Sequence, residues 1–304
     1  MADEEQAVRI AREVILSTFA GEGARGLTWA FRRISAAMQD LHVDEGAVVF
    51  TAGEPAAYLH FVVDGELALS APDRPPIVFG PRSAVGMIDA FLGRPFAWTA
   101  AATRKSHILR IRIEDWVDVL EDSFELARII LTNFATGVHR LRLRPPPLGG
   151  FEEPRQLPGP SEAPPQLHLV DRVLLLRSAP VFAQAGTQTL ASLAELATEV
   201  RATAGQLLAP KGEPKRQMFV VASGEISATR EDPTLVGRFR RGSLVCGAIS
   251  LVGATDYELR AETPSLVLAI AREDYLDVME EHFGLFRSAI RALVEERSHL
   301  MARG

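Results

Sequence analysis

The chain has 304 residues, of which 47% are hydrophobic and 24% are charged, with a formal net charge of −6 and a pI near 5.7. This length and composition exclude disorder throughout and predict two domains of ordinary size. The acidic balance argues against duplex DNA or an anionic membrane as the main partner, because both require a concentrated basic face.

The N-terminus, MADEEQAVRIAREVILSTFAG, is acidic and lacks the positive-then-apolar layout of a signal peptide. No apolar run approaches the roughly 18 residues that span a bilayer, so we expect a cytosolic protein with no membrane span. A helix is expected within residues 5–38. Basic residues are nearly all arginine, with lysine only at Lys105, Lys211 and Lys215, which is typical of a GC-rich genome.

Short strands are expected next. The runs AVVFTAG, YLHFVVDGELALS, PIVFG and HILRIR are aliphatic or β-branched and are broken by glycine, proline or aspartate. Asp64-Gly65 lies between two such runs and predicts a hairpin turn, with Gly65 at positive φ and Glu66 after it. Several short strands with tight turns favour a barrel or jelly roll.

The stretch GMIDAFLGRPFAWTA, residues 86–100, has the outline of a loop that holds a small molecule. A glycine precedes a short apolar turn of helix, a second glycine follows, and small residues end the stretch. Only Asp89 and Arg94 are charged in it.

A long helix is expected over EDWVDVLEDSFELARIILTNFATGVHRLRL. Its apolar residues recur at helical spacing and form one stripe, which includes Leu131, Phe134, Val138 and Leu141. The stripe either packs against its own barrel, which we favour, or pairs with another helix as a dimer seam. A segment rich in proline, glycine and acidic residues follows at 144–166 and predicts a linker.

The second half repeats the first at an offset of 159 positions. Gly46 falls on Gly205, GEP at 53–55 falls on GEP at 212–214, and the offset holds over some 80 residues, as the pairs at the end of this sentence illustrate: Gly65-Glu66 and Gly224-Glu225, Ser106 and Ser265, Glu114-Asp115 and Glu273-Asp274. The chain is therefore interpreted as a duplicated domain, with a first copy at 1–143 and a second at 167–304.

The second copy has matching elements. Strands are expected in QLLAPKG, MFVVASGEISATR, VGRFR and SLVLAIA, with a hairpin turn at Gly224 and Glu225. Before them, a helix breaks at Pro180 and another begins at Thr187 or Thr189. The final helix carries an apolar stripe that includes Phe286, Ile290 and Leu293.

These motifs resemble the cyclic nucleotide-binding domain family. The resemblance covers about 40–141 and 170–301 and rests on the GxxxxxxGEP starts, the FVVDGEL and FVVASGEI segments, the glycines Gly86 and Gly247 that open a phosphate cassette, and the IEDW and REDY turns. It implies an α+β fold in which each copy is an eight-stranded jelly roll with flanking helices, the last of which transmit the state of the ligand.

The family's cassette uses a glutamate for the ribose hydroxyl and an arginine for the cyclic phosphate. In the first copy Met87 stands at the glutamate position and Phe96 at the arginine position. The residues that follow are Ala97, Trp98 and Thr99.

In the second copy Ala248 stands at the glutamate position, and the arginine position falls on Thr255 or Tyr257. Because an anion needs a positive partner, we do not expect cyclic AMP or cyclic GMP to bind in the usual manner.

Other basic residues could replace the arginine, and the candidates are Arg82 and Arg94 in the first copy and Arg240, Arg241 and Arg260 in the second. We favour solvated surface arginines instead. The apolar residues of the first cassette could also line a pocket for a lipid-like molecule or a flat ring, and these are Met87, Phe91, Phe96 and Trp98. We favour a cavity that these side chains fill.

No motif for catalysis, a metal or a cofactor is present, and the seven histidines are scattered. His60 lies on a strand and is interpreted as a core or rim histidine and not a haem ligand. Cys246, the single cysteine, has apolar neighbours and is expected to be buried and inert.

Two functions follow. We favour a non-enzymatic scaffold that binds a protein partner or a further copy of itself. The alternative is a sensor in which one copy binds a small ligand and shifts its terminal helix. Direct DNA binding is not expected, because the chain ends too soon after the last helix for the family's usual helix-turn-helix.

Overall fold

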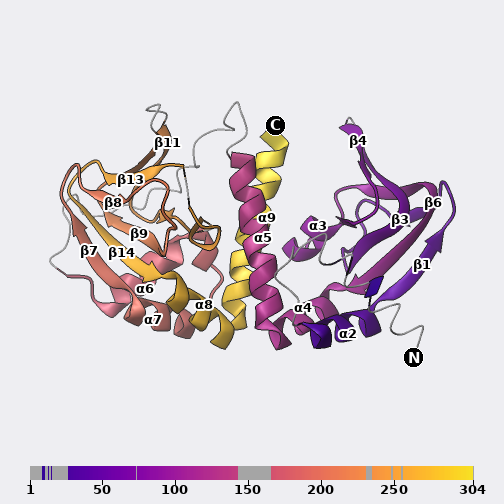
Figure 1. The fold of residues 1–304 in the computed structure, drawn as a ribbon, viewed down its shortest axis with the longest axis horizontal. Coiled ribbons are helices and arrows are strands. Elements are labelled where there is room, and N and C mark those ends of the chain that lie inside the picture. The colour runs from indigo at the N-terminus through magenta and orange to yellow at the C-terminus, as the bar shows by residue number, and fades with distance from the viewer. Residues whose placement is uncertain are drawn as a thin grey trace. The chain divides into compact units, whose positions relative to one another are not determined.

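A computed structural model describes residues 9, 10, 13, 15, 27–72, 74–142, 166–230, 235–247, 249–254 and 256–303. The chain divides into two compact units, residues 1–133 and 134–304, which we call the first and second domains. Figure 1 labels their elements. The predicted linker lies outside the described residues except for Gln166, and the helix predicted within 5–38 is described in part.

The first domain alternates helices and strands in the predicted order. Its elements are α2 (Thr28–Ala37), β1 (Gln39–Val43), β2 (Val48–Phe50), β3 (Tyr58–Ala71), β4 (Arg74–Phe79), β5 (Ser83–Val85), α3 (Met87–Leu92), β6 (Thr99–Arg112), α4 (Ile113–Asp122) and the start of α5 (Phe124–Arg142). The sequence did not predict β1, β5 or the first half of β6 as strands. These segments are short or interrupted by polar residues, so only their pairing identifies them.

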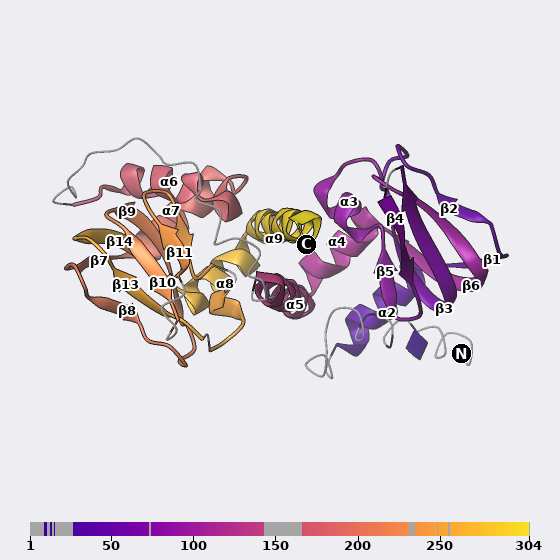
Figure 2. The same ribbon diagram turned by 90° about the horizontal axis from the view of Figure 1, so that it is seen from above.

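The long strands β3 and β6 are the centre of the first barrel. They pair with each other antiparallel along nearly their whole length, β1 and β2 add to β6, and β4 and β5 add to β3. Figure 2 shows the strands curled around a common interior. That interior holds an apolar cluster, which includes Phe50, Val62, Leu67, Phe96 and Ile108.

The predicted hairpin turns at Gly65 and Gly224 are wrong. Gly65 lies inside β3, where the register with β6 shifts between Val62 and Leu67 and the chain keeps its direction. Its φ is +90°, and a Cβ there would collide with Ser106 on β6. The Ser106 hydroxyl accepts a hydrogen bond from the Glu66 N–H at 2.9 Å. Glycine is therefore needed for a bend with close strand approach, and the turn that local sequence suggests does not form.

The same bend occurs in the second domain. Gly224, with φ +81°, separates β9 (Gln217–Ser223) from β10 (Ile226–Thr229), and a Cβ at Gly224 would collide with Ser265. These two strands pair with other strands and not with each other. The Glu225 N–H donates to the Thr263 hydroxyl at 2.9 Å. Gly224 and Glu225 thus carry the chain from one sheet to the other.

The second domain has the same order of elements. They are α6 (Leu169–Ser178), η3 (Pro180–Phe182), α7 (Thr187–Leu196), β7 (Thr198–Ala202), β8 (Leu207–Ala209), β9, β10, β11 (Leu235–Phe239), β12 (Leu244–Val245), η4 (Ile249–Leu251), β13 (Glu258–Ala261), β14 (Ser265–Ala271), α8 (Arg272–Glu281) and α9 (Phe283–Arg303). The strand orders are β11-β10-β13-β8 and β12-β9-β14-β7, all antiparallel. The predicted break at Pro180 and the helix start at Thr187 are confirmed.

The apolar stripes of the last helices are buried. Leu131, Phe134 and Val138 of α5 are at most 3% exposed, whereas Leu141 is half-buried. On α9, Phe286, Ile290 and Leu293 are buried, and this helix packs on η3 and α8 of its own domain. Within residues 134–304, the Arg297 guanidinium of α9 also lies 6.0 Å from the Phe134 ring of α5. Packing inside the chain thus accounts for much of the stripe on α9.

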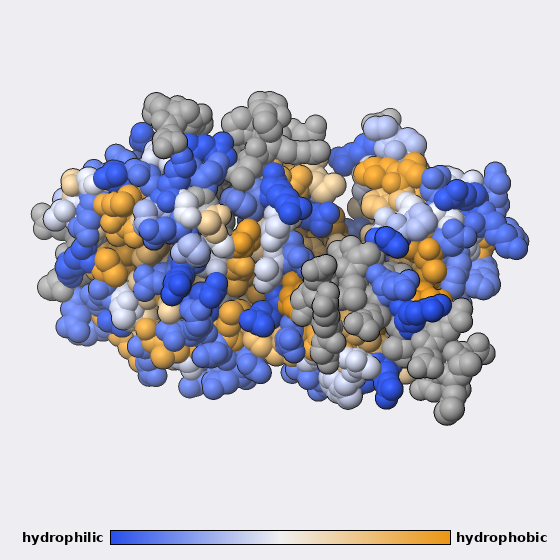
Figure 3. Space-filling model, viewed as in Figure 1, coloured by the Kyte–Doolittle hydropathy of each residue, from blue (hydrophilic) through white to orange (hydrophobic). Residues whose placement is uncertain are grey.

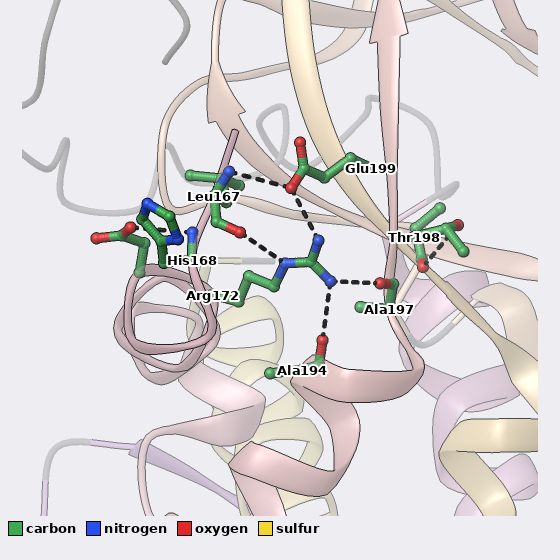
Figure 4. A network of polar contacts seen from close by, with 9 residues as sticks. Leu167, His168, Arg172, Ala194, Ala197, Thr198 and Glu199 are labelled. Atoms are coloured by element: carbon green, nitrogen blue, oxygen red, sulfur yellow. Dashed lines mark hydrogen bonds and ion pairs between the residues drawn. The ribbon is translucent and has the colours of Figure 1, made fainter. Parts of the chain in front are cut away.

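Arg172 of α6 joins three elements of the second domain (Figure 4). Its guanidinium donates to the carbonyl oxygens of Leu167, Ala194 and Ala197 at 3.1, 3.2 and 2.9 Å. It also forms an ion pair of 2.8 Å with Glu199 on β7, whose carboxylate accepts the Leu167 N–H at 3.1 Å. The two charged side chains are only 20% and 17% exposed.

Replacing Arg172 with glutamine is therefore expected to destabilise the second domain by about 2–3 kcal/mol, because it leaves a shielded carboxylate and three carbonyl groups without their donor. Differential scanning calorimetry of the full chain measures the loss. The control is Arg177→Gln on the same helix, since Arg177 makes an exposed hydrogen bond of 3.0 Å to Thr187. Equal transitions for the two variants would contradict the structural role of Arg172.

Candidate functional site

The first cassette begins where β5 ends. Gly86 adopts φ +80°, α3 follows, and Gly93 at φ +63° ends the helix. The buried Asp89 carboxylate accepts a bond of 2.7 Å from Arg94 Nε and a bond of 3.0 Å from the Ala97 N–H. Asp89 therefore holds the turn after the helix, and Arg94 spends its charge on this pair.

Phe96 fills the position at which the family places its arginine. Its ring is 5% exposed and stacks on the Phe50 ring with centroids 3.8 Å apart and planes 18° apart. A Cβ on Gly86 would lie 2.7 Å from the Phe96 ring, so the cassette backbone rests directly on it. Met87, at the glutamate position, is also buried. The cassette thus presents an aromatic ring and a thioether where a cyclic nucleotide needs charge.

His60 on β3 completes this aromatic group. Its ring lies 5.1 Å from that of Phe50 and 6.3 Å from that of Phe96, and it is 2% exposed. Burial, and then the charge of Arg110 across the strand pair, lowers the pKa of His60 to about 4. Among the described residues no group forms a hydrogen bond with its Nδ1. His60 is therefore a neutral core histidine, as the sequence predicted.

Trp98 lies apart from the buried aromatic group. It is half-buried, and the Arg74 guanidinium of β4 lies 5.7 Å from its ring. Thr99 accepts the Ala52 N–H at 3.0 Å, and Phe91 is half-buried. Met87 and Phe96 are thus in the core, while the other two members of the pocket suggested by the sequence are partly exposed.

The second cassette opens at Cys246 and not at Gly247. Val245 pairs with Phe219 as Val85 pairs with His60, and Cys246, like Gly86, has positive φ, here +63°. Gly247 therefore corresponds to Met87, and the assignment of the glutamate position to Ala248 is one residue too late. Ala248 itself lies outside the described residues.

The far end of the second cassette follows from an isolated bridge. Pro214 pairs with Ala254 as Pro55 pairs with Pro95, so the next residue, Thr255, corresponds to Phe96. Thr255 also lies outside the described residues. Tyr257 is 2% exposed and belongs to the core of the second barrel.

The candidate arginines of the second copy have partners within their own domain. Arg260 pairs with Glu258 at 2.8 Å, and Arg240 Nε pairs with Glu225 at 2.7 Å. Arg241 donates to the Ala222 carbonyl at 2.7 Å. Arg82 of the first copy has φ +67° and its N–H donates to the Val62 carbonyl at 2.8 Å. None of these contacts brings a guanidinium to a cassette.

Lys215 is the basic residue that sequence reasoning missed. It is 3% exposed, its ammonium donates to the Pro210 carbonyl, and its N–H donates to Gly253 at 3.4 Å. Burial lowers the pKa of Lys215. The available signal was its place directly after GEP, where the first copy has Ala56.

Cys246 is the apolar thiol that the sequence predicted. It is 6% exposed, and burial raises its pKa to about 12, although the nearby Lys215 charge acts in the opposite direction. Within the described residues no group of three or more His, Cys, Asp or Glu side chains could hold a metal ion. No helix among those described is long and apolar enough to cross a membrane.

Comparison with known proteins gives two kinds of similarity. A model of the cyclic nucleotide-binding domain matches residues 40–123 and 199–282, together more than half of the chain. No curated protein sequence matches the chain.

Three solved structures illustrate the similarity of fold. The regulatory domain of Toxoplasma gondii PKA with cAMP is 15% identical, with 92% of this chain and 93% of that chain covered and a TM-score of 0.34. The regulatory subunit of a cAMP-independent protein kinase A from Trypanosoma brucei is 12% identical, with coverages of 92% and 89% and a TM-score of 0.36. The sensor domain of the transcriptional regulator DNR from Pseudomonas aeruginosa is 20% identical, with coverages of 46% and 93% and a TM-score of 0.39.

Two successive matches to one family model thus fall on the two repeats found in the sequence, and each contains a barrel with a cassette. The chain belongs to the cyclic nucleotide-binding domain family, of which it carries two tandem copies.

Proposed function

We propose that this chain is a non-enzymatic scaffold whose first domain has exchanged ligand binding for a filled core. The single observation that carries the proposal is the Phe96 ring, which lies between Phe50 and the Gly86 backbone at the place of the phosphate contact. A cyclic nucleotide would have to displace this buried ring and would meet no cation there.

The energies favour an unliganded first domain. A buried phosphate that lacks its ion pair loses a few kcal/mol, which is about two to three decades of affinity. Displacing Phe96 would add the cost of exposing an aromatic side chain, about 2–3 kcal/mol. Arg94 offers no replacement, since it already pairs with Asp89 at 2.7 Å.

Protein surfaces then carry the function. Val170 and Leu174 of α6 are 69% and 61% exposed and lie four residues apart on one helix face. On the side of the second domain seen in Figure 3, hydrophobic residues lie at the surface between hydrophilic ones. Exposed aliphatic side chains of this kind suit a protein partner or a further copy of the chain, whereas the net charge of −6 disfavours DNA.

Tryptophan fluorescence tests the proposal on the full chain, because Trp29, Trp98 and Trp116 all lie in the first domain. Saturating cyclic AMP or cyclic GMP is expected to leave the thermal transition seen by fluorescence unchanged. A ligand at 100 times its Kd would stabilise the domain by about 2.7 kcal/mol. An upward shift of that transition would contradict the filled first cassette.

The scaffold role has its own test. Size-exclusion chromatography with light scattering is expected to find an oligomer, or affinity capture a defined protein complex, and Val170→Asp with Leu174→Asp is expected to weaken it. Asp118→Asn on α4, an exposed change on the first domain, is the control. A monomer that captures no protein would remove the basis of the scaffold proposal.

A sensor is the second candidate function, and one observation favours it. Lys215 places a buried positive charge in the second domain, where the cassette begins at Cys246 and ends beside Gly253. The second domain could then bind an anion and pass its state to α8 and α9, which follow β14 directly.

A further inference from the structure

The two domains differ most in the residue that follows the GEP motif. In the first domain this residue is Ala56, which packs against the apolar core, and the cassette is filled by Phe96. In the second domain it is Lys215, whose side chain is buried. The equivalence rests on the matching bridges of the preceding prolines, Pro55 with Pro95 and Pro214 with Ala254.

Lys215 reaches both ends of the second cassette. Its N–H donates to the Gly253 carbonyl near the end of the cassette at 3.4 Å. Its ammonium is near enough to Cys246, the first residue of the cassette, for each to influence the pKa of the other. The ammonium therefore lies beneath the loop that in this fold surrounds a ligand.

The ammonium has more donors than the surrounding protein uses. It carries three N–H groups, and among the described residues only the Pro210 carbonyl accepts one of them. Glu213 is the acidic residue that acts on it, but Glu213 is exposed and no ion pair joins the two in the described part of the chain. A buried cation with neutral partners is costly, and burial accordingly lowers its pKa.

The backbone at the cassette opening is strained as well. Cys246 adopts φ +63°, a conformation that glycine takes freely and that Gly86 takes in the first domain. The strain and the buried charge lie side by side at one loop. Such features gather at sites where a ligand repays their cost.

We propose that the second domain binds a phosphate-bearing anion, with Lys215 as the positive partner that the cassette lacks at its family arginine position. This inference rests on the sensor function and not on the scaffold function. The first domain takes no part in it, because its equivalent position is Ala56 and its cassette is filled.

Isothermal titration calorimetry on the full chain tests the proposal with two probes, cyclic AMP and inorganic phosphate. At least one is expected to bind with one site per chain, and Lys215→Met is expected to weaken that binding by about 100-fold. The matched controls Lys211→Met and Lys105→Met change exposed lysines and are expected to bind as the wild type does. Binding of cyclic AMP alone identifies a nucleotide ligand, and binding of phosphate identifies a free anion.

A second measurement removes the dependence on a folded Lys215 variant. The chain has three lysines, so labelling with ¹³C-lysine gives three sets of Cε signals, which the two control variants assign by elimination. The anion is expected to shift the Lys215 signal alone. Absence of binding by both probes, unchanged binding in Lys215→Met, or an unshifted Lys215 signal would each overturn the proposal. The tryptophan transition of the first domain separates this result from the first-cassette test.

Discussion

Replacing Phe96 with alanine is expected to lower the free energy of unfolding of the first domain by about 3–5 kcal/mol. The ring is 5% exposed, stacks on Phe50 at 3.8 Å and supports the backbone at Gly86, so its removal leaves a cavity that the sheet cannot close. Urea unfolding followed by tryptophan fluorescence measures the loss, since the three tryptophans lie in this domain alone.

Two further substitutions make this test specific to the filled cassette. Phe96→Leu retains most of the apolar volume and is expected to cost less than the alanine variant. Phe96→Arg restores the family residue but buries a guanidinium beside neutral groups, so we expect it to cost at least as much as alanine. Phe91→Ala removes a half-buried ring from the same cassette and is the control.

The double variant Met87→Glu with Phe96→Arg separates charge from space. If lost charge alone prevents binding, this variant regains affinity for cyclic AMP. We expect no binding, because the Phe50 ring and the close Gly86 backbone still shape the interior for an aromatic side chain. Recovery of cyclic AMP binding with wild-type stability would show that the cavity is intact and would contradict our interpretation of Phe96.

Lowering the pH from 7 to 5 is expected to destabilise the first domain by about 2 kcal/mol through His60 alone. The folded pKa is about 4, below the model value of 6.5, so the unfolded chain binds the proton first. Stability from this group is therefore complete above pH 6.5 and is lost progressively as the pH falls towards 4. Burial is the main cause, because the ring lies at 2% exposure among Phe50 and Phe96.

His60→Leu is expected to remove that part of the pH dependence, since leucine has no proton to bind. The measurement is the slope of unfolding free energy against pH between 7 and 5, again from tryptophan fluorescence in urea. His42→Leu, which changes an exposed histidine on β1, corrects for the loss of one histidine from the unfolded chain. Equal slopes for wild type and His60→Leu would show that His60 is not buried neutral.

Local pattern sufficed for much of the fold. The repeat offset of 159 residues identified two copies, the helix stripes predicted which faces of α5 and α9 are buried, and Pro180 marked a helix boundary. These features are readable because helical periodicity and proline act within a few residues of the chain.

The bends at Gly65 and Gly224 were misread because a glycine between two strand patterns is the same signal for a hairpin and for a bend within one strand. The choice depends on Ser106 and Ser265, which lie about 40 residues away in the chain and touch these glycines only in the sheet. Strand partners at that separation leave no local pattern.

The sequence by itself determined that the chain is a duplicated domain and that Phe96 and Met87 stand where a cyclic nucleotide would need charge. Tertiary structure alone decided that the Phe96 ring is packed, that Cys246 opens the second cassette and that Lys215 lies buried beneath it. The physical reason is that residue type follows from the sequence, whereas burial and register arise from strand pairs that join distant segments.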